Sequence, residues 1–343
     1  MKIGEIPLSV PLIQAPMAGF SNYAFREMIR HSGGCGLTTT EMVNARSFIQ
    51  IEKNLRHSPP RLWGIPSETR PVAVQIWDNV PENLAEVGRV LSQIWKVSVI
   101  DINFGCPSPT VSQRSNSGAY LLDYPEKIES LVRLTVQASA PTPVTVKMRL
   151  GTKPERITVC EAAQAAQCAG AAAVYVHGRT ASQGYSGQAD WDEIAKVKSV
   201  LKIPLIGNGD IKTPQQAIDR LANYPVDGLM IGRGSLGKPW IFKQIFTEML
   251  RSKLPQTRPE LFADSSSVCS ENAAFTIPPL NELVREHFEL VCLSLSERDA
   301  VLNMRKIVCR YAEGRPGACE FRNSIAKIES KNAFLSLCDT FFE

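Results

Sequence analysis

Short apolar runs rich in valine and isoleucine recur along the first two thirds of the chain, separated by polar segments long enough to form helices. Runs that are continuously apolar, rather than alternating, are typical of strands buried on both faces of a parallel sheet. Eight strands alternating with helices over about 240 residues favour a (β/α)8 TIM barrel over the alternative, an open doubly wound sheet. The predicted strands lie at residues 11–16, 36–42, 71–76, 97–103, 143–148, 173–177, 203–207 and 227–231.

The remainder of the chain carries no strand-like run. Residues 251–279 are rich in Pro, Ser, Thr and Asn without periodicity, which predicts a loop or linker. Residues 280–343 have a helical pattern, and four apolar residues there share the spacing of one helix face: Met304, Ile307, Val308 and Tyr311. We therefore predict a barrel domain at 1–250 and a smaller all-helical domain at 280–343.

The composition excludes several classes of protein. Of the 343 residues, 44% are hydrophobic and 21% charged, which is typical of globular proteins. No apolar run reaches the roughly 18–20 residues of a membrane helix, and the N-terminus lacks the apolar stretch of a signal peptide. Nine cysteines without a Cys-x-x-Cys pair favour reduced thiols over disulfides or a zinc site. We expect a soluble, cytoplasmic protein without a metal, whose net charge of +4 permits a nucleic-acid partner.

Each predicted strand ends in a polar or glycine-containing feature. In a TIM barrel the carboxyl ends of the strands form the active face, so these features are expected to meet there. They are Pro16-Met17-Ala18, Glu41, Gln75, Asn103 with Gly105-Cys106-Pro107, Lys147 with Arg149, His177 with Arg179, Asn208-Gly209-Asp210, and Gly232-Arg233. The coincidence of all eight predicts one site at the barrel mouth.

Glycine-rich turns follow the seventh and eighth predicted strands, at 207–209 and 232–234. Such turns expose backbone amides, and this part of a barrel commonly binds phosphate. Arg233 would add charge-assisted hydrogen bonds. The alternative is that these glycines only turn tight corners; we favour phosphate binding.

Three side chains at the predicted mouth suggest chemistry. Lys147 ends a buried strand, where an ammonium needs a partner such as a bound anion or an electron-rich ring; alternatively its amine reaches water. Cys106 is a nucleophile, a general acid or a small apolar filler, and the rigid turn around it favours chemistry. His177 closes a buried strand and is predicted to contact a ligand. Glu41 and Asp210 are interpreted as structural or orienting carboxylates.

Six segments, taken in order along the chain, resemble motifs of the bacterial tRNA-dihydrouridine synthases. They are Ala15-Pro16-Met17-Ala18-Gly19, Asp101-Ile102-Asn103 with Gly105-Cys106-Pro107, Thr145-Val146-Lys147-Met148-Arg149, Val176-His177-Gly178-Arg179-Thr180, Gly207-Asn208-Gly209-Asp210-Ile211 and Met230-Ile231-Gly232-Arg233. The similarity runs from about residue 3 to residue 246 and continues more weakly through the C-terminal region.

The resemblance implies a flavin mononucleotide (FMN) at the barrel mouth, NADPH as its reductant and tRNA as the substrate. It implies that Pro16, Met17 and Ala18 line the flavin ring, and that Gln75 and Lys147 bind its polar edge. The residues implied around the ribityl phosphate are His177, Asn208, Gly209, Asp210, Gly232 and Arg233. Those expected to contact the substrate are Asn103, Arg149 and Arg179.

The implied reaction is the reduction of specific tRNA uridines to 5,6-dihydrouridine. A hydride passes from N5 of the reduced flavin to C6 of uracil, and Cys106 donates a proton to C5. Cys106 must therefore be a thiol, not a thiolate, when the substrate binds. Lys147 would stabilise the anionic reduced ring. The chain has no dinucleotide fingerprint, which fits docking of NADPH over the flavin.

A basic segment of the helical region is the candidate RNA-binding surface. Between Arg298 and Lys327 the sequence holds seven basic and three acidic side chains. The alternative is a solvated helix face, because residues 280–343 as a whole are about neutral. The residues expected to contact the RNA backbone are Arg305, Lys306, Arg310, Arg315 and Arg322.

Two other functions stay open. An FMN-dependent oxidoreductase acting on a free pyrimidine, like dihydroorotate dehydrogenase, would have no use for a basic helical domain. A non-catalytic tRNA-binding protein would carry no flavin. The sequence does not indicate which uridine is modified or the oligomeric state.

Overall fold

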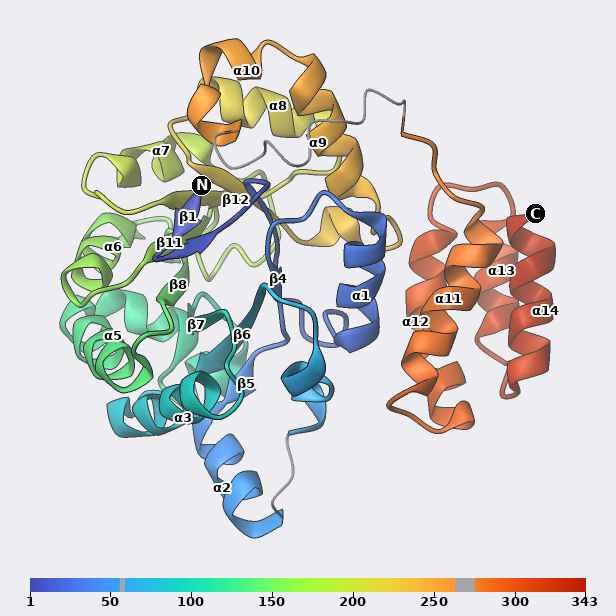
Figure 1. The fold of residues 1–343 in the computed structure, drawn as a ribbon, viewed down its shortest axis with the longest axis horizontal. Helices are drawn as coiled ribbons and strands as arrows, with labels where there is room; N and C mark the ends of the chain where they lie inside the picture. The colour runs from blue at the N-terminus through green and yellow to red at the C-terminus, as the bar shows by residue number, and fades with distance from the viewer. Residues whose placement is uncertain (56–58, 263–274) are drawn as a thin grey trace.

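Eight parallel strands close into a barrel (Figure 1). The computed structural model describes residues 1–55, 59–262 and 275–343, with only the backbone for residues 53–55. In chain order the strands are β3 (Leu12–Gln14), β4 (Thr38–Thr39), β6 (Val72–Trp77), β7 (Val99–Phe104), β8 (Val144–Arg149), β11 (Ala173–His177), β12 (Leu205–Asn208) and β13 (Gly228–Ile231). A further short strand, β5 (Val43–Asn44), pairs with the end of β6.

Contacts between the first and last strands decide between the two predicted architectures. β13 pairs with β3, and Ile13 of β3 forms a parallel bridge with Leu37, just before β4. The Gln14 amide donates to the Leu37 carbonyl at 2.9 Å, so hydrogen bonding continues around the whole ring. The TIM barrel prediction is confirmed, and the open sheet is excluded because neither β3 nor β4 is a free edge.

Helices cover the outside of the barrel, and local sequence sets where several of them begin. Pro81, Pro125 and Pro214 stand in the first turn of their helices, where the missing amide hydrogen has no intrahelical partner to lose. Asp190 caps another helix by accepting from the Glu193 amide at 2.9 Å. These helices are α1 (Tyr23–Ser32), α2 (Ala45–Leu55), α3 (Pro81–Gln93), α5 (Pro125–Ser139), α6 (Val159–Cys168), α7 (Trp191–Lys198), α8 (Pro214–Asn223) and α9 (Ile241–Arg251).

The amino-terminal end of the barrel is closed by a hairpin. Its strands are β1 (Lys2–Ile3) and β2 (Ile6–Pro7), and Ile3 and Leu8 join the apolar cluster that fills the barrel interior with Ile13, Tyr175 and Met230. This plug leaves the carboxyl ends of the strands as the open end. Shorter elements in the loops are α4 (Pro109–Ser112), the hairpin of β9 (Gly151–Lys153) and β10 (Arg156–Ile157), and the 3-10 helices η1 (Pro60–Leu62), η2 (Ile65–Ser67), η3 (Gly118–Asp123) and η4 (Arg233–Ser235).

The segment predicted as a linker, 251–279, begins with ordered structure. It contains α10 (Leu254–Thr257) and η5 (Pro259–Phe262), whose residues Leu254 and Leu261 are buried against the barrel. Arg258 fixes this part by donating to the Leu221 carbonyl at 2.7 Å. The prediction of a loop is therefore wrong for its first part, because two buried leucines override the polar composition. Residues 263–274 of the predicted linker lie outside the described residues.

Four helices form a C-terminal unit beside α1, drawn in orange and red in Figure 1. They are α11 (Leu280–Cys292), α12 (Glu297–Tyr311), α13 (Ala318–Ile325) and α14 (Lys331–Phe342). The predicted stripe of Met304, Ile307, Val308 and Tyr311 is buried in their core. Barrel residues Ala24, Met28 and Trp240 belong to the same apolar cluster, so the unit is docked on the barrel rather than tethered to it.

Gly237 lies at a close approach of the two units. Its φ of +70° is in the left-handed region, and a Cβ built there would lie 2.3 Å from the backbone of Arg310 in α12. A glycine without a side chain is therefore required for α12 to seat on the barrel.

Replacement of Gly237 by alanine is expected to loosen this docking. Gly314→Ala is the matched control, since Gly314 has a φ of +81° but no atom near its Cβ position. The control should lose only the backbone penalty of about 1–2 kcal/mol, and Gly237→Ala a further 1–3 kcal/mol or so from the steric overlap. Denaturant unfolding of both variants measures the difference, and equal losses would contradict the contact.

Candidate active site

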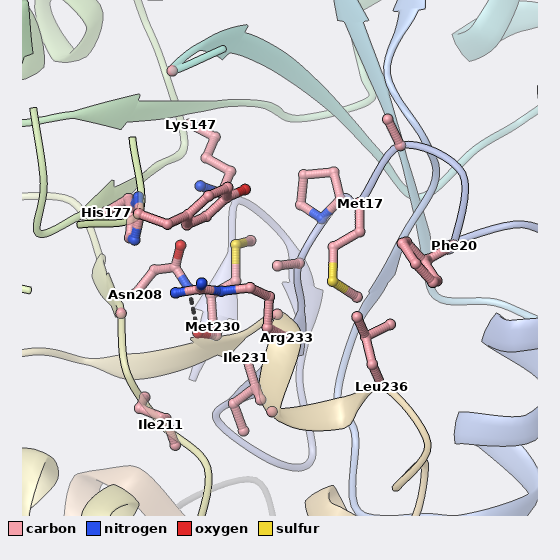
Figure 2. A pocket seen from close by; sticks show the side chains of 18 of the residues that line it. Met17, Phe20, Lys147, His177, Asn208, Ile211, Met230, Ile231, Arg233 and Leu236 are labelled. Carbon is pink, nitrogen blue, oxygen red and sulfur yellow. Dashed lines mark hydrogen bonds between the residues drawn. The ribbon is translucent and has the colours of Figure 1, made fainter. Parts of the chain in front are cut away.

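The carboxyl ends of the strands surround a cavity of about 390 Å³. In Figure 2, Met17 and Phe20 lie on one side of it, with His177 and Asn208 facing them. Every residue assigned above to a flavin site lines this cavity: Pro16, Met17, Ala18, Gln75, Lys147, His177, Asn208, Gly209, Asp210, Gly232 and Arg233. Cys106, Asn103 and Arg149 line it as well.

One end of the cavity is made of backbone turns after β12 and β13. Asn208 is fixed by donating from Nδ2 to the Met230 carbonyl at 2.7 Å, which ties the two turns together (Figure 2). Within the described residues, the amides of Gly209 and Gly232 have no protein acceptor. Gly209 has a φ of +139°, and a Cβ there would lie 2.5 Å from Ala189. The turn therefore needs glycine, and it leaves amide hydrogens for a ligand.

Lys147 is half-buried at the cavity wall, and among the described residues its ammonium has no hydrogen-bond acceptor. Burial and, to a smaller extent, the charge of Arg149 lower the pKa of Lys147, Asp101 and Cys106 act in the opposite direction, and the result is a pKa of about 8. An ammonium in this state gains from any anion or electron-rich group that enters the cavity.

Cys106 is held by the strand end that precedes it. Asn103 Oδ1 accepts hydrogen bonds from the amides of Gly105 at 3.0 Å and Cys106 at 2.9 Å, and Ala119 donates to the Cys106 carbonyl at 3.1 Å. Burial raises the pKa of the Cys106 thiol, and the Ser108 amide and the charge of Arg149 only partly oppose it. The thiol form therefore dominates at neutral pH.

His177 is neutral. Burial depresses its pKa strongly, and the positive charges of Lys147, Arg149 and Arg179 add to that effect. It is buried at the end of β11, with Nε2 3.4 Å from Arg179 Nη1. A neutral imidazole offers either a donor or an acceptor to a ligand in the cavity.

Arg179 is buried and bonded to the protein, and its predicted contact with the substrate stays a prediction. Its guanidinium is 2% exposed and donates to both oxygens of Asp210, at 3.0 and 2.7 Å, and to the Ser186 and Gly187 carbonyls. Asp210 therefore holds a buried cation and the loop after β11. Burial raises the Asp210 pKa, but its bonds to Arg179 and to the Ala189 amide bring that pKa below its ordinary value.

The guanidinium of Arg149 also donates hydrogen bonds to the protein. It donates from Nε to the Gly105 carbonyl at 2.9 Å and from Nη1 to the carbonyls of Thr180 and Gly184. It thus ties the Cys106 turn to the loop after β11, while lining the cavity beside the thiol.

Four of the five predicted RNA-contacting residues separate into two pairs, and the fifth, Arg315, lies over the Phe342 ring at 5.8 Å. Lys306 and Arg310 are exposed on α12 and lie over the Phe20 ring, at 5.4 and 6.0 Å, and Arg310 lines the cavity. Arg305 instead donates to the Ile328 carbonyl at 3.0 Å, and Arg322 to the Ala318 carbonyl at 3.0 Å. Arg305 thereby joins α12 to the turn before α14, and its predicted contact with RNA stays a prediction.

Several lining residues were not found from the sequence. Tyr185 is 62% exposed in the loop after β11, and the Arg233 guanidinium lies 4.1 Å from its ring centre. An exposed tyrosine beside the predicted His-Gly-Arg-Thr segment was the available signal. Phe20, Met42, Ile211 and Leu236 also line the cavity, as ordinary apolar positions in the sequence.

Two absences can be reported for the described part of the chain. No three His, Cys, Asp or Glu side chains there cluster as a metal site, and none of its helices is long and apolar enough to cross a membrane.

Comparison with known proteins agrees with the motifs at this cavity. The profile of the dihydrouridine synthase (Dus) family matches residues 13–343. The chain belongs to the dihydrouridine synthase family. It is 32% identical to the probable tRNA-dihydrouridine synthase of Mycobacterium tuberculosis, over 99% of this chain and 84% of the relative. It is 32% identical to tRNA-dihydrouridine synthase B of Klebsiella pneumoniae, over 100% of this chain and 99% of the relative.

A solved structure outside the family shares the fold of this dihydrouridine synthase family member. Histamine dehydrogenase from Rhizobium sp. 4-9 superposes with a TM-score of 0.53 at 13% identity, over 73% of this chain and 48% of that one. At this identity the likeness supports the barrel architecture alone.

The pH dependence of Cys106 alkylation tests the state of the thiol. Because burial raises its pKa, the thiolate fraction is small at pH 7 and grows as the pH rises. We expect the iodoacetamide rate at Cys106, followed by mass spectrometry of its peptide, to keep rising above pH 9. N-acetylcysteine in the same buffers is the reference, and Cys106→Ser identifies the peptide. A plateau below pH 8 would show an acidic cysteine instead.

Proposed function

We propose that this protein reduces specific uridines in tRNA to 5,6-dihydrouridine, with FMN as cofactor and NADPH as reductant. The observation that carries the proposal is the placement of a protonated thiol, Cys106, and an ammonium without an acceptor, Lys147, on the wall of one cavity. Family membership and the names of the relatives support the same reaction and the same kind of substrate.

The cavity fits FMN on its own chemistry. Gly209 and Gly232 offer amide hydrogens and Arg233 a charge, which suits a phosphate. Residues Pro16, Met17 and Ala18 offer an apolar wall to a ring. His177 and Asn208 would add hydrogen bonds, and Gln75 and Lys147 would bind the polar edge. In this assignment Asp210 supports the phosphate end through Arg179, the Ala189 amide and Arg233, whose Nη2 lies 3.6 Å from Asp210 Oδ1.

The thiol of Cys106 would provide the proton. When bound and reduced, FMN supplies a hydride to C6 of uracil, which leaves negative charge to be neutralised at C5. Cys106 then donates its proton to C5 as a general acid. Lys147 and Arg149 lower the free energy of the thiolate that remains, since both charges favour the anion. Water reprotonates the sulfur once the product leaves.

Lys147 would contact the cofactor rather than the uracil base. Its ammonium lines the cavity without a hydrogen-bond acceptor among the described residues, so it would stabilise negative charge on the reduced ring. NADPH is the reductant that the family resemblance implies, and it would meet the flavin in the open mouth.

Lys306 and Arg310 are the assigned contacts to the tRNA backbone. Extraction of a stacked uridine costs roughly a few kcal/mol, which phosphate contacts near the mouth must offset. Both cations stand at that mouth, over Phe20. Asn103 and Tyr185 are assigned to the uracil ring, because both line the cavity. A free pyrimidine would need none of the cations on α12, which disfavours the dihydroorotate dehydrogenase-like alternative.

Activity on tRNA tests the proposal directly. Purified protein with FMN and NADPH should form dihydrouridine in tRNA from cells that lack the gene, and nucleoside mass spectrometry should map it to defined positions. Cys106→Ala should lower the rate about 100-fold to 10,000-fold, as expected for loss of a general acid, without changing flavin content or NADPH oxidation. Equal activity on free uridine would favour the pyrimidine alternative, and protein without flavin would favour a non-catalytic tRNA-binding protein.

The two cations on α12 predict where tRNA binds. The double variant Lys306→Ala, Arg310→Ala should weaken tRNA binding about tenfold and reduce the slope of log Kd against log salt by about one per lost phosphate contact. Arg322→Ala is the matched control on the same domain, because Arg322 bonds within its own helix. Filter binding over a salt series measures both. A control as weak as the double variant would move the RNA surface toward α13.

A further inference from the structure

A line of hydrogen bonds runs beneath the cavity from β8 to the Cys106 turn. Asp101 of β7 is fully buried, accepting from Thr145 Oγ1 at 2.8 Å and from Gln75 Nε2 at 2.7 Å. Gln75 Oε1 accepts from Asn103 Nδ2 at 2.8 Å. Asn103 Oδ1 in turn accepts from the amides that begin the Cys106 turn. Asp101 does not line the cavity, so it has no part in the chemistry assigned above.

The groups at the two ends of this line of hydrogen bonds fix the orientation of the two side-chain amides between them. An amide side chain has a donor side and an acceptor side, so each link fixes the orientation of the next. At the turn the backbone offers only donors, which requires the oxygen of Asn103. At the far end an ionised Asp101 offers only acceptors, which requires the nitrogen of Gln75. Both ends therefore demand the same orientation of the two amides.

Without Asp101, the Gln75 side chain loses its acceptor and the line of hydrogen bonds loses its fixed end. Gln75 Nε2 has no other acceptor among the described residues, and Asn103 Nδ2 has, besides Gln75, only the Met42 sulfur at 3.6 Å. A buried donor left without an acceptor is costly, so Gln75 would rotate toward the cavity. Asn103 would then turn to satisfy its own nitrogen, and the two amides of the turn would lose their shared acceptor.

We propose that Asp101 is the positioning residue for Cys106, acting through Gln75 and Asn103 as the acceptor that anchors their orientation. The proposal rests on the proposed function for its catalytic meaning, since the proton donor is the group that is positioned. Its structural part concerns the chain's own hydrogen bonds and is measurable without turnover.

Hydrogen exchange at the Gly105 and Cys106 amides, in the full-length protein, tests the structural part. Asp101→Leu removes the acceptor at similar volume and should speed exchange at these two amides about tenfold, leaving β11 and β12 unchanged. Asp101→Asn keeps an oxygen for Gln75, since the Thr145 hydroxyl can rotate to accept from the new amide, and should retain most of the protection. Gln75→Met removes the middle link and should match Asp101→Leu.

The Asn variant separates anchoring from charge. If the negative charge of Asp101 near Lys147 were what matters, Asn and Leu would speed exchange equally, which would overturn the proposal. Protection unchanged in both Asp101→Leu and Gln75→Met would overturn it as well, as would faster exchange spread over all strands. Should Asp101→Leu not fold, Gln75→Met and Asp101→Asn still give the comparison.

Turnover links the line to the reaction. Asp101→Leu should lower kcat for dihydrouridine formation about tenfold, with KM for tRNA within twofold of the parent, and Asp101→Asn should recover most of kcat. A rise in KM with kcat unchanged would overturn the link to Cys106. Absence of dihydrouridine formation in the parent protein would sink the proposed function alone, since the exchange result stands without it.

Discussion

Parallel pairing between neighbouring strands places the chemistry of this protein. Register pairs Asn103 with Lys147 across β7 and β8, and His177 with Asn208 across β11 and β12. Residues paired in this way lie at one height in the barrel wall, so groups from distant parts of the sequence meet at its carboxyl end. The ring is completed where Ile13 of β3 forms a bridge with Leu37, and the hairpin that plugs the opposite end leaves this rim as the open one.

Positively charged side chains predominate at the rim of the cavity, and burial determines the protonation state of the titratable groups there. Lys147, Arg149 and Arg233 face the cavity, and the nearby carboxylates Asp101 and Asp210 are engaged by hydrogen bonds to the protein. The same desolvation keeps Cys106 protonated and His177 neutral, since a charged form of either would need solvent. A wall of this kind is suited to the anionic cofactor and the uncharged acid of the proposed function.

The barrel and most of its mouth were predictable, because continuous apolar runs fix the strands and each strand end carries its own polar signal. The protein partners of Arg179 were not predictable, because the sequence marks a charge without saying whether water, a carboxylate or a carbonyl receives its hydrogen bonds. Arg305 shows the same limit, since a backbone acceptor leaves no trace in composition. Tyr185 and the approach of Arg310 to the cavity depend on loops and on domain docking, which periodicity does not encode. Burial of Leu254 and Leu261 orders a segment whose polar composition predicts a loop.

Arg310 takes part both in the docking of the C-terminal unit and in the lining of the cavity. Its backbone rests on Gly237, and its side chain reaches the cavity. The width of the entrance is therefore a property of the pair of units and not of the barrel. A change in the tilt of α12, even without any change at the rim, would reshape the opening through which a base arrives. Selectivity among chemically similar substrates can therefore be altered by a change in how α12 packs on the barrel.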